Sequence, residues 1–137
     1  STVGVSEDMW IHVDPTSGVP MYLQIVEQVR SAAATGVLQE GEPLPSVREL
    51  AVELAINPNT VARAYRELQR EGVITVERGT GTRISSRPPS ISSDEVAARL
   101  QSAARRLAVE AYSLGVSREE LMSAVAEALN DVWPNTD

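Results

Sequence analysis

Residues 44–72 have the sequence LPSVRELAVELAINPNTVARAYRELQREG, and this stretch decides the fold. Ser46 and Glu49 have the spacing of a capping box, which begins a helix. Asn57 followed by Pro58 supplies an N-cap and a proline at the first helical position, which together predict the start of another helix. Two short helices joined by about three residues are the skeleton of a helix-turn-helix.

The second of these helices has two chemically different faces. When its residues are projected at about 100° per residue, apolar and cationic side chains separate. One side carries Asn59, Arg63, Arg66 and Arg70, and the other carries Val61, Tyr65 and Leu68. We therefore expect the apolar side to pack inward and the cationic side to remain exposed.

A β-hairpin is predicted directly after this helix. Gly72 ends the helix, and the segments 73–77 and 82–85 have the composition of two strands. The glycine-containing run Arg78-Gly79-Thr80-Gly81 between them predicts a tight turn. A helix-turn-helix followed by a hairpin is a winged helix, so we call this hairpin the wing.

The residues upstream of the helix-turn-helix predict one more helix. It begins at Pro20 and ends at Gly36, and its apolar side chains recur at helical spacing. Residues 10–13 alternate large side chains and predict a short strand, which a turn at residues 14–18 follows. Residues 41–45 contain two prolines and predict a rigid connector.

Two further helices are predicted downstream of the wing. Residues 87–91 have the composition of a stiff linker. Ser92 with Glu95, and Ser117 with Glu120, then form two more capping boxes, each of which begins a helix with an apolar stripe. Two isolated helices cannot bury enough apolar surface to offset the entropy of ordering them.

We therefore expect this helix pair to associate with the same pair of a second copy, as a homodimer. The residues expected at the dimer interface are Val96, Leu100, Leu107, Leu114, Leu121, Val125, Leu129 and Trp133. The alternative is that the helix pair folds back on the winged helix of its own chain.

The predicted fold is mainly α with a small β-hairpin. Residues 1–8 are expected to be disordered and residues 9–86 to form a winged helix-turn-helix domain. After the linker at 87–91, residues 92–137 are expected to form a two-helix antiparallel dimerisation domain. Because the chain has no Phe and few aromatic residues, its core must consist of Leu, Val, Ile and Ala side chains.

The exposed face of the second helix of the helix-turn-helix suits a DNA duplex. Side chains near the N-terminal end of such a helix reach base edges in the major groove. Arginine matches guanine bidentately and asparagine matches adenine, so Arg63 and Asn59 are the candidate base readers. The alternative is a solvated helix face with Arg–Glu pairs, for example Arg63 with Glu67.

Two more elements have the chemistry of phosphate contacts. Arg48 lies on the first turn of its helix, where free N–H groups favour an anion, although it could instead pair with Glu49 or Glu53. The glycines of the wing allow backbone N–H groups to approach a phosphate or the minor groove. The residues expected to contact double-stranded DNA are Ser46, Arg48, Asn57, Asn59, Thr60, Arg63, Arg66, Arg78, Gly79, Thr80 and Gly81.

The formal net charge of −7 argues against a nucleic-acid partner when the chain is taken as a whole. Residues 57–89, however, contain six arginines and three acids, so the predicted helix and wing are locally basic. The chain has no cysteine, no signal peptide and no apolar run of the ~20 residues that span a bilayer. We therefore expect a cytoplasmic protein without a membrane partner.

No pattern in the sequence predicts catalysis. His12 is the only histidine and has no acid cluster beside it, and no Ser or acid has a His or Cys partner. No enzyme activity, cofactor or metal site is therefore predicted. A protein-interaction module on a winged-helix scaffold is the alternative function. A small-molecule effector is a further candidate partner, although no residue set points to one.

The motifs, taken together, resemble the GntR family of bacterial regulators, and the short helical tail resembles its YtrA-type subfamily. The matching motifs are Pro20-x-Tyr22-x-Gln24-Ile25, Gly36-x-Leu38-x-x-Gly41, Leu44-Pro45-Ser46-Val47-Arg48-Glu49-Leu50-Ala51, Asn57-Pro58-Asn59-Thr60-Val61, Ala64-Tyr65-x-x-Leu68, Glu71-Gly72 and Arg78-Gly79-Thr80-Gly81-Thr82. The resemblance implies a transcriptional regulator, usually a repressor, that binds a palindromic operator. It also implies DNA contacts at Arg48, Asn59, Thr60 and Gly79, whereas some branches carry an arginine at the position of Pro58.

Overall fold

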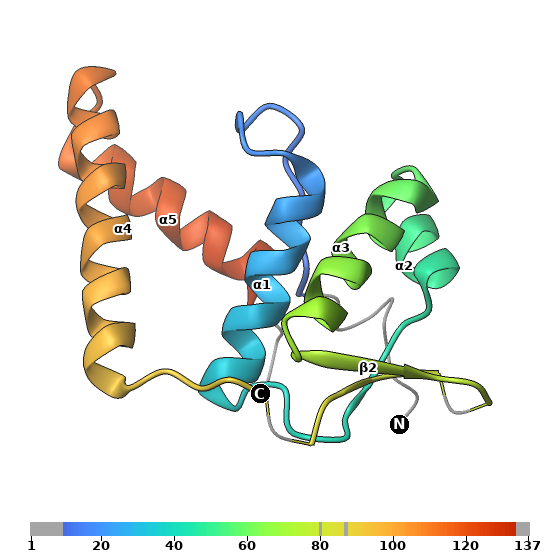
Figure 1. Cartoon of the computed structure of the whole chain (residues 1–137). Coiled ribbons are helices and arrows are strands. Elements are labelled where there is room, and N and C mark those ends of the chain that lie inside the picture. The colour runs from blue at the N-terminus through green and yellow to red at the C-terminus, as the bar shows by residue number, and fades with distance from the viewer. Residues whose placement is uncertain (1–9, 80, 87, 134–137) are drawn as a thin grey trace. The chain divides into compact units, whose positions relative to one another are not determined.

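The computed structural model describes residues 10–79, 81–86 and 88–133, which form five helices and three short strands (Figure 1). In chain order these are α1 (Met21–Thr35), β1 (Pro43–Leu44), α2 (Val47–Leu54), α3 (Pro58–Arg70), β2 (Ile74–Glu77), β3 (Gly81–Ile84), α4 (Ser93–Ser113) and α5 (Arg118–Val132). The chain divides into two compact units, Ser1–Ser90 and Ile91–Asp137. The first unit contains α1 to β3, and the second contains α4 and α5.

Two glutamines of α1 hold the extended segment that precedes it. The Gln28 side chain accepts a hydrogen bond from the His12 N–H (3.0 Å) and donates one to the His12 carbonyl (2.7 Å). Gln24 likewise accepts from the Asp14 N–H (2.8 Å) and donates to the Asp14 carbonyl (3.0 Å). The strand predicted for residues 10–13 is therefore wrong, because helix side chains satisfy the backbone groups that a neighbouring strand would bind.

The helix-turn-helix is confirmed and consists of α2 and α3. The Ser46 hydroxyl accepts a hydrogen bond from the Glu49 N–H (3.1 Å), and the Glu49 carboxylate accepts one from the Ser46 N–H (2.9 Å). Between the helices the chain passes through Ala55, whose φ of 57° lies in the left-handed region. This residue stops α2 and turns the chain toward α3 within a few residues.

The wing is confirmed, and it belongs to a slightly larger sheet than the sequence predicts. β2 and β3 form the antiparallel hairpin, and β1 pairs with the other side of β3, so the strand order is β1-β3-β2. Pro43 lies opposite Arg83 and Leu44 opposite Thr82. Part of the predicted connector at residues 41–45 is therefore an edge strand. The sequence does not predict this strand, because two residues are too few to show an alternating pattern. Its proline is tolerated because the strand lies at the edge of the sheet.

One hydrophobic core joins the helices of the first unit to the sheet. Its fully buried large side chains are Ile25, Val26, Val29, Leu50, Val61, Leu68, Val73, Ile74 and Ile84. These side chains come from α1, α2, α3 and the segment around the hairpin, and all of them are aliphatic, as the composition predicts. The core fixes α3 between α1 and the sheet and leaves the opposite face of α3 exposed.

The second unit consists of two capped helices. The Ser117–Glu120 capping box at the start of α5 is confirmed. At the start of α4, Ser92 accepts the expected hydrogen bond from the Glu95 N–H, but the Glu95 carboxylate accepts one from Arg99 (2.7 Å) instead of closing the box. A carboxylate with a cation one turn further along the helix has a stronger partner than a backbone N–H.

This second unit has almost no core of its own. Among its described residues only Ala111 is buried, while Leu121 and Val125 are half-buried and Leu129 is exposed. Within the described residues, no helix combines the length and the apolar character that a membrane crossing requires.

Candidate nucleic-acid interface

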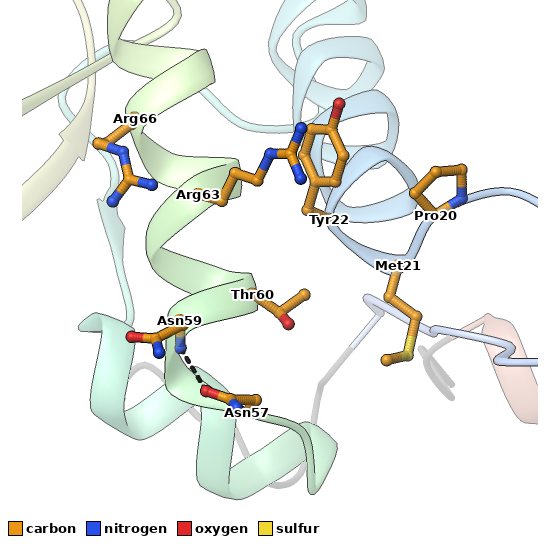
Figure 2. A pocket seen from close by; sticks show the side chains of 8 residues that line it. All are labelled: Pro20, Met21, Tyr22, Asn57, Asn59, Thr60, Arg63 and Arg66. Carbon is orange, nitrogen blue, oxygen red and sulfur yellow. Dashed lines mark hydrogen bonds between the residues drawn. The ribbon is translucent and has the colours of Figure 1, made fainter.

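The start of α3 is fixed by its own first residues. The Asn57 side-chain oxygen accepts a hydrogen bond from the Asn59 N–H at 2.8 Å, and Pro58 occupies the first helical position (Figure 2). The predicted N-cap is therefore confirmed. Because the cap uses the side-chain oxygen of Asn57, the side chain of Asn59 is left on the exposed first turn of the helix.

The buried side of α3 holds the helix in place. Val61, Ala64 and Leu68 are fully buried in the core of the first unit. The buried Tyr65 hydroxyl donates a hydrogen bond to the Pro45 carbonyl (2.7 Å), which ties α3 to the segment that precedes α2. Burial raises the pKa of Tyr65 above its ordinary value, which keeps the phenol protonated as a donor. The orientation of the opposite face is therefore set by packing and by one buried hydrogen bond.

The exposed face of α3 presents the predicted polar side chains. Asn59, Arg63 and Arg66 are exposed and Thr60 is half-buried. The central carbon of the Arg63 guanidinium lies 3.9 Å from the centroid of the Tyr22 ring, which belongs to the first turn of α1. Arg63 does not pair with Glu67, since the described part of the chain gives Arg63 neither a hydrogen bond nor an ion pair.

Arg70, on the same face of α3, is paired with a neighbouring side chain. It donates hydrogen bonds to both carboxylate oxygens of Glu67, from Nε at 3.2 Å and from Nη2. These bonds hold the pKa of Glu67 below its ordinary value. Of the three arginines on the predicted cationic side of α3, Arg63 and Arg66 therefore have no ion pair among the described residues. The third guanidinium is paired with Glu67.

A shallow hollow of about 470 Å³ lies between the first turns of α1 and α3 (Figure 2). It is lined by Pro20, Met21, Tyr22, Asn57, Asn59, Thr60, Arg63 and Arg66. Five of these residues are among those that sequence analysis predicts to contact DNA. The other three, at the start of α1, were missed, because nothing local in the sequence relates them to α3.

The other predicted contact residues lie on separate elements of the first unit. Arg48 is exposed on the first turn of α2, and among the described residues it has no ion pair with Glu49 or Glu53. Arg78, Gly79 and Gly81 are exposed at the tip of the wing, whereas Thr80 lies outside the described residues. Ser46 is exposed, but its hydroxyl oxygen already accepts the capping hydrogen bond.

Both glycines of the wing tip need their conformational freedom. Gly79 and Gly81 each have a φ of 85°, in the region that L side chains adopt only with strain. An added Cβ would meet no atom within 4 Å at either position, so the strain comes from the backbone alone. The exposed N–H groups of this turn can approach an anion closely.

The predicted dimer-interface residues lie on α4, on α5 and at the residue that follows each of these helices. Val96, Leu100, Leu107, Leu114, Leu129 and Trp133 are exposed, and Leu121 and Val125 are half-buried. Leu114 and Trp133, at the ends of the two helices, are 70% and 66% exposed. Large apolar side chains at such exposures form a surface that water solvates poorly. In the described part of the chain, acidic and histidine side chains form no group that could hold a metal ion.

Comparisons with known proteins identify the family of the chain. The family model described as "Bacterial regulatory proteins, gntR family" matches residues 21–84. The chain is similar to the HTH-type transcriptional repressor YtrA of Bacillus subtilis, with 38% identity over 89% of this chain and 94% of the relative.

Two solved structures extend the likeness to the fold. A transcriptional regulator from Oenococcus oeni is 37% identical, with coverage of 85% of this chain and 97% of that chain and a TM-score of 0.53. YtrA from Sulfolobus acidocaldarius, a GntR-family transcription factor, is 33% identical, with coverage of 70% and 98% and a TM-score of 0.53.

Proposed function

This chain belongs to the GntR family of bacterial regulatory proteins, and we propose that it is a sequence-specific DNA-binding transcriptional repressor that acts as a homodimer on a palindromic operator. The observation that carries the proposal is the exposed first half of α3. There Asn59, Arg63 and Arg66 are free of ion pairs within the described residues, while the other side of the helix is buried. The likeness to a named repressor over most of both chains supports the direction of regulation.

The DNA contacts divide into two chemical classes. Asn59, Thr60 and Arg63 read base edges, because they lie on the first two turns of the helix that enters the major groove. Arg48, Arg66 and the wing bind phosphates and position the helix along the duplex. The overall acidity of the chain does not oppose this, since charges farther than a Debye length of about 10 Å from the contact are largely screened.

The domain assignment follows from the same proposal. Residues 9–86 form the DNA-binding domain, residues 87–91 the linker and residues 92–137 the dimerisation domain. The exposed leucines of α4 and α5 support dimerisation, because a second copy would remove them from water. Two copies related by a twofold axis would place their α3 helices about 34 Å apart, or a multiple of that distance, along the duplex. A regulator of this kind acts on DNA in the cytoplasm.

The direct test is selection of bound sequences from a random DNA pool with the purified full chain. We expect an enriched inverted repeat, and binding that weakens with salt as phosphate contacts release counterions. Arg63→Ala should weaken binding to the enriched sequence by about 1–3 kcal/mol and relax its base preference. The matched control is Arg70→Ala, on the same helix, whose guanidinium is already paired with Glu67.

The outcomes separate the candidate functions. If no sequence is enriched, the assignment as a sequence-specific regulator is wrong, and a protein-interaction module becomes the better explanation. If a sequence is enriched but Arg63→Ala binds it with unchanged preference, the base-reading role of α3 is wrong.

A further inference from the structure

The contact between Tyr22 and Arg63 joins two elements that are far apart in the sequence. Tyr22 lies on the first turn of α1, and its ring is half-buried and packs against the hydrophobic core. Arg63 lies on the second turn of α3, and its guanidinium carbon is 3.9 Å from the centroid of that ring (Figure 2). The ring is held by the core, whereas the arginine is anchored only by its own helix and by this contact.

This geometry leaves the hydrogen-bonding edge of the arginine available. A guanidinium that lies over an aromatic ring uses its flat face, while its N–H donors point outward in the plane of the group. Guanine is read through those in-plane donors. An arginine can therefore rest on a tyrosine ring and bind a guanine simultaneously.

The contact also restricts the arginine before DNA arrives. A free arginine side chain has about 2 kcal/mol of rotamer entropy, part of which is lost when it binds. Arg66 provides the internal comparison, because it lines the same hollow but has no ring contact, hydrogen bond or ion pair among the described residues. Of the two arginines on this face that have no ion pair among the described residues, the one that contacts Tyr22 is the preorganised one.

We propose that Tyr22 is a positioning residue that presets Arg63 for a guanine contact, and so contributes to base preference without touching a base. This inference rests on the proposed function, because it assigns Tyr22 a role in the reading of the operator. It names one residue of α1, outside the helix-turn-helix, as a determinant of specificity.

The test measures binding of two Tyr22 variants to the selected operator and to operators with each base pair changed in turn. Tyr22→Leu removes the ring and keeps apolar bulk, whereas Tyr22→Phe keeps the ring and removes only the hydroxyl. We expect Tyr22→Leu to lose roughly two- to tenfold in affinity, the range of an exposed to partly desolvated cation–π contact. The loss should fall on the base pair whose preference Arg63→Ala relaxes, and Tyr22→Phe should bind like the wild type.

A double-mutant cycle separates positioning from a general structural role. In an Arg63→Ala background, Tyr22→Leu should cause no further loss, because the interaction that it removes is already absent. An equal loss of affinity from Tyr22→Leu in the wild-type and the Arg63→Ala backgrounds would overturn the inference. A loss by Tyr22→Phe that is uniform over all sequences would also overturn it, since that result means that the hydroxyl binds a phosphate.

A measurement on the unaltered chain keeps the test independent of variant folding. In the free wild-type protein, the Arg63 guanidinium signals in an NMR spectrum should carry a ring-current shift, assigned by their absence in Arg63→Ala. Signals at random-coil positions would overturn the inference. If the wild type selects an operator and Tyr22→Leu reads it with unchanged preference, the inference fails and the proposed function stands. If the wild type selects nothing, the proposed function itself fails.

Discussion

Arg30 of α1 donates two hydrogen bonds to the carboxylate of Glu71, from Nε at 2.9 Å and from Nη2 at 2.7 Å. Glu71 is the C-cap of α3, so this bidentate pair joins the middle of α1 to the end of the helix that we propose reads DNA. Both side chains are partly buried, with 35% and 22% of their surface exposed. Tyr22 and Arg63 join the same two helices near their N-terminal ends.

We predict that the Arg30–Glu71 pair contributes a measurable coupling energy to folding. Because the pair is bidentate and partly buried, a double-mutant cycle with Arg30→Ala and Glu71→Ala should give a coupling energy of about 1 kcal/mol. This value is at the upper end of the range for ion pairs near the surface. Urea unfolding measures the free energies, and the coupling should fall at about 1 M salt. A coupling of zero would mean that core packing alone holds α1 on α3.

Glu67 should make stability depend on pH in the acid range. Hydrogen bonds from Arg70 lower the pKa of Glu67 in the folded state, so the unfolded chain takes up a proton first as the pH falls. The stabilising effect of Glu67 is therefore present above its ordinary pKa of about 4.3 and is lost as the pH falls below it. The free energies of unfolding of the wild type and Glu67→Gln should converge between about pH 5 and pH 3.

Glu53→Gln is the control for this experiment. Glu53 is exposed on α2 and has no hydrogen bond or ion pair among the residues that the structure describes. This variant makes the same change of side chain without removing a hydrogen bond or an ion pair, so it reports the effect of the substitution alone. A difference between Glu67→Gln and the wild type that stays constant over the same pH range would contradict the prediction.

Arg48→Ala should weaken DNA binding without changing base preference. Arg48 is exposed at the N-terminal end of α2 and has no ion pair in the described part of the chain, which suits a phosphate contact. The variant should bind all sequences more weakly, and the slope of log affinity against log salt should fall by about 1. Arg105→Ala, an exposed arginine of α4, serves as the control. An unchanged salt slope would remove Arg48 from the interface.

Leu107→Glu should disrupt the proposed homodimer. Leu107 is 46% exposed and belongs to the apolar stripe of α4, so a buried carboxylate there would destabilise association. Val109→Glu is a matched control, because Val109 is 59% exposed on the same helix but points to roughly the opposite side. Light scattering at micromolar concentration should give the dimer mass for the wild type and the control, and the monomer mass for Leu107→Glu. A monomeric wild type would refute dimerisation.

The features that sequence analysis predicted correctly in the first unit depend on neighbours in the chain. The Ser46–Glu49 capping box, the Asn57 cap and the glycine-containing wing all involve groups within a few residues of one another. Their geometry is fixed by local backbone conformation and short hydrogen bonds. The buried face of α3 follows from helical periodicity, which is also local.

The predictions that were wrong, and the features that sequence analysis missed, depend on residues that are far apart in the sequence. Residues 10–13 have the pattern of a strand, but Gln28 of α1 takes the backbone hydrogen bonds of His12. The two residues of β1 become a strand only because β3 lies beside them. Glu67 has two arginines within helical reach. It pairs with Arg70, while Arg63 lies over the Tyr22 ring of another helix, a contact that no local pattern predicts.

By itself, the sequence determined the helix boundaries, the wing and the identity of the face that carries Asn59 and Arg63. Only the tertiary structure decided which of those cations remain unpaired and that the first turn of α1 completes the hollow beside them. The difference lies in the distance along the chain over which each interaction acts. Caps and periodicity act over one or two turns, whereas the approach of α1 to α3 results from a core whose side chains come from four segments of the chain.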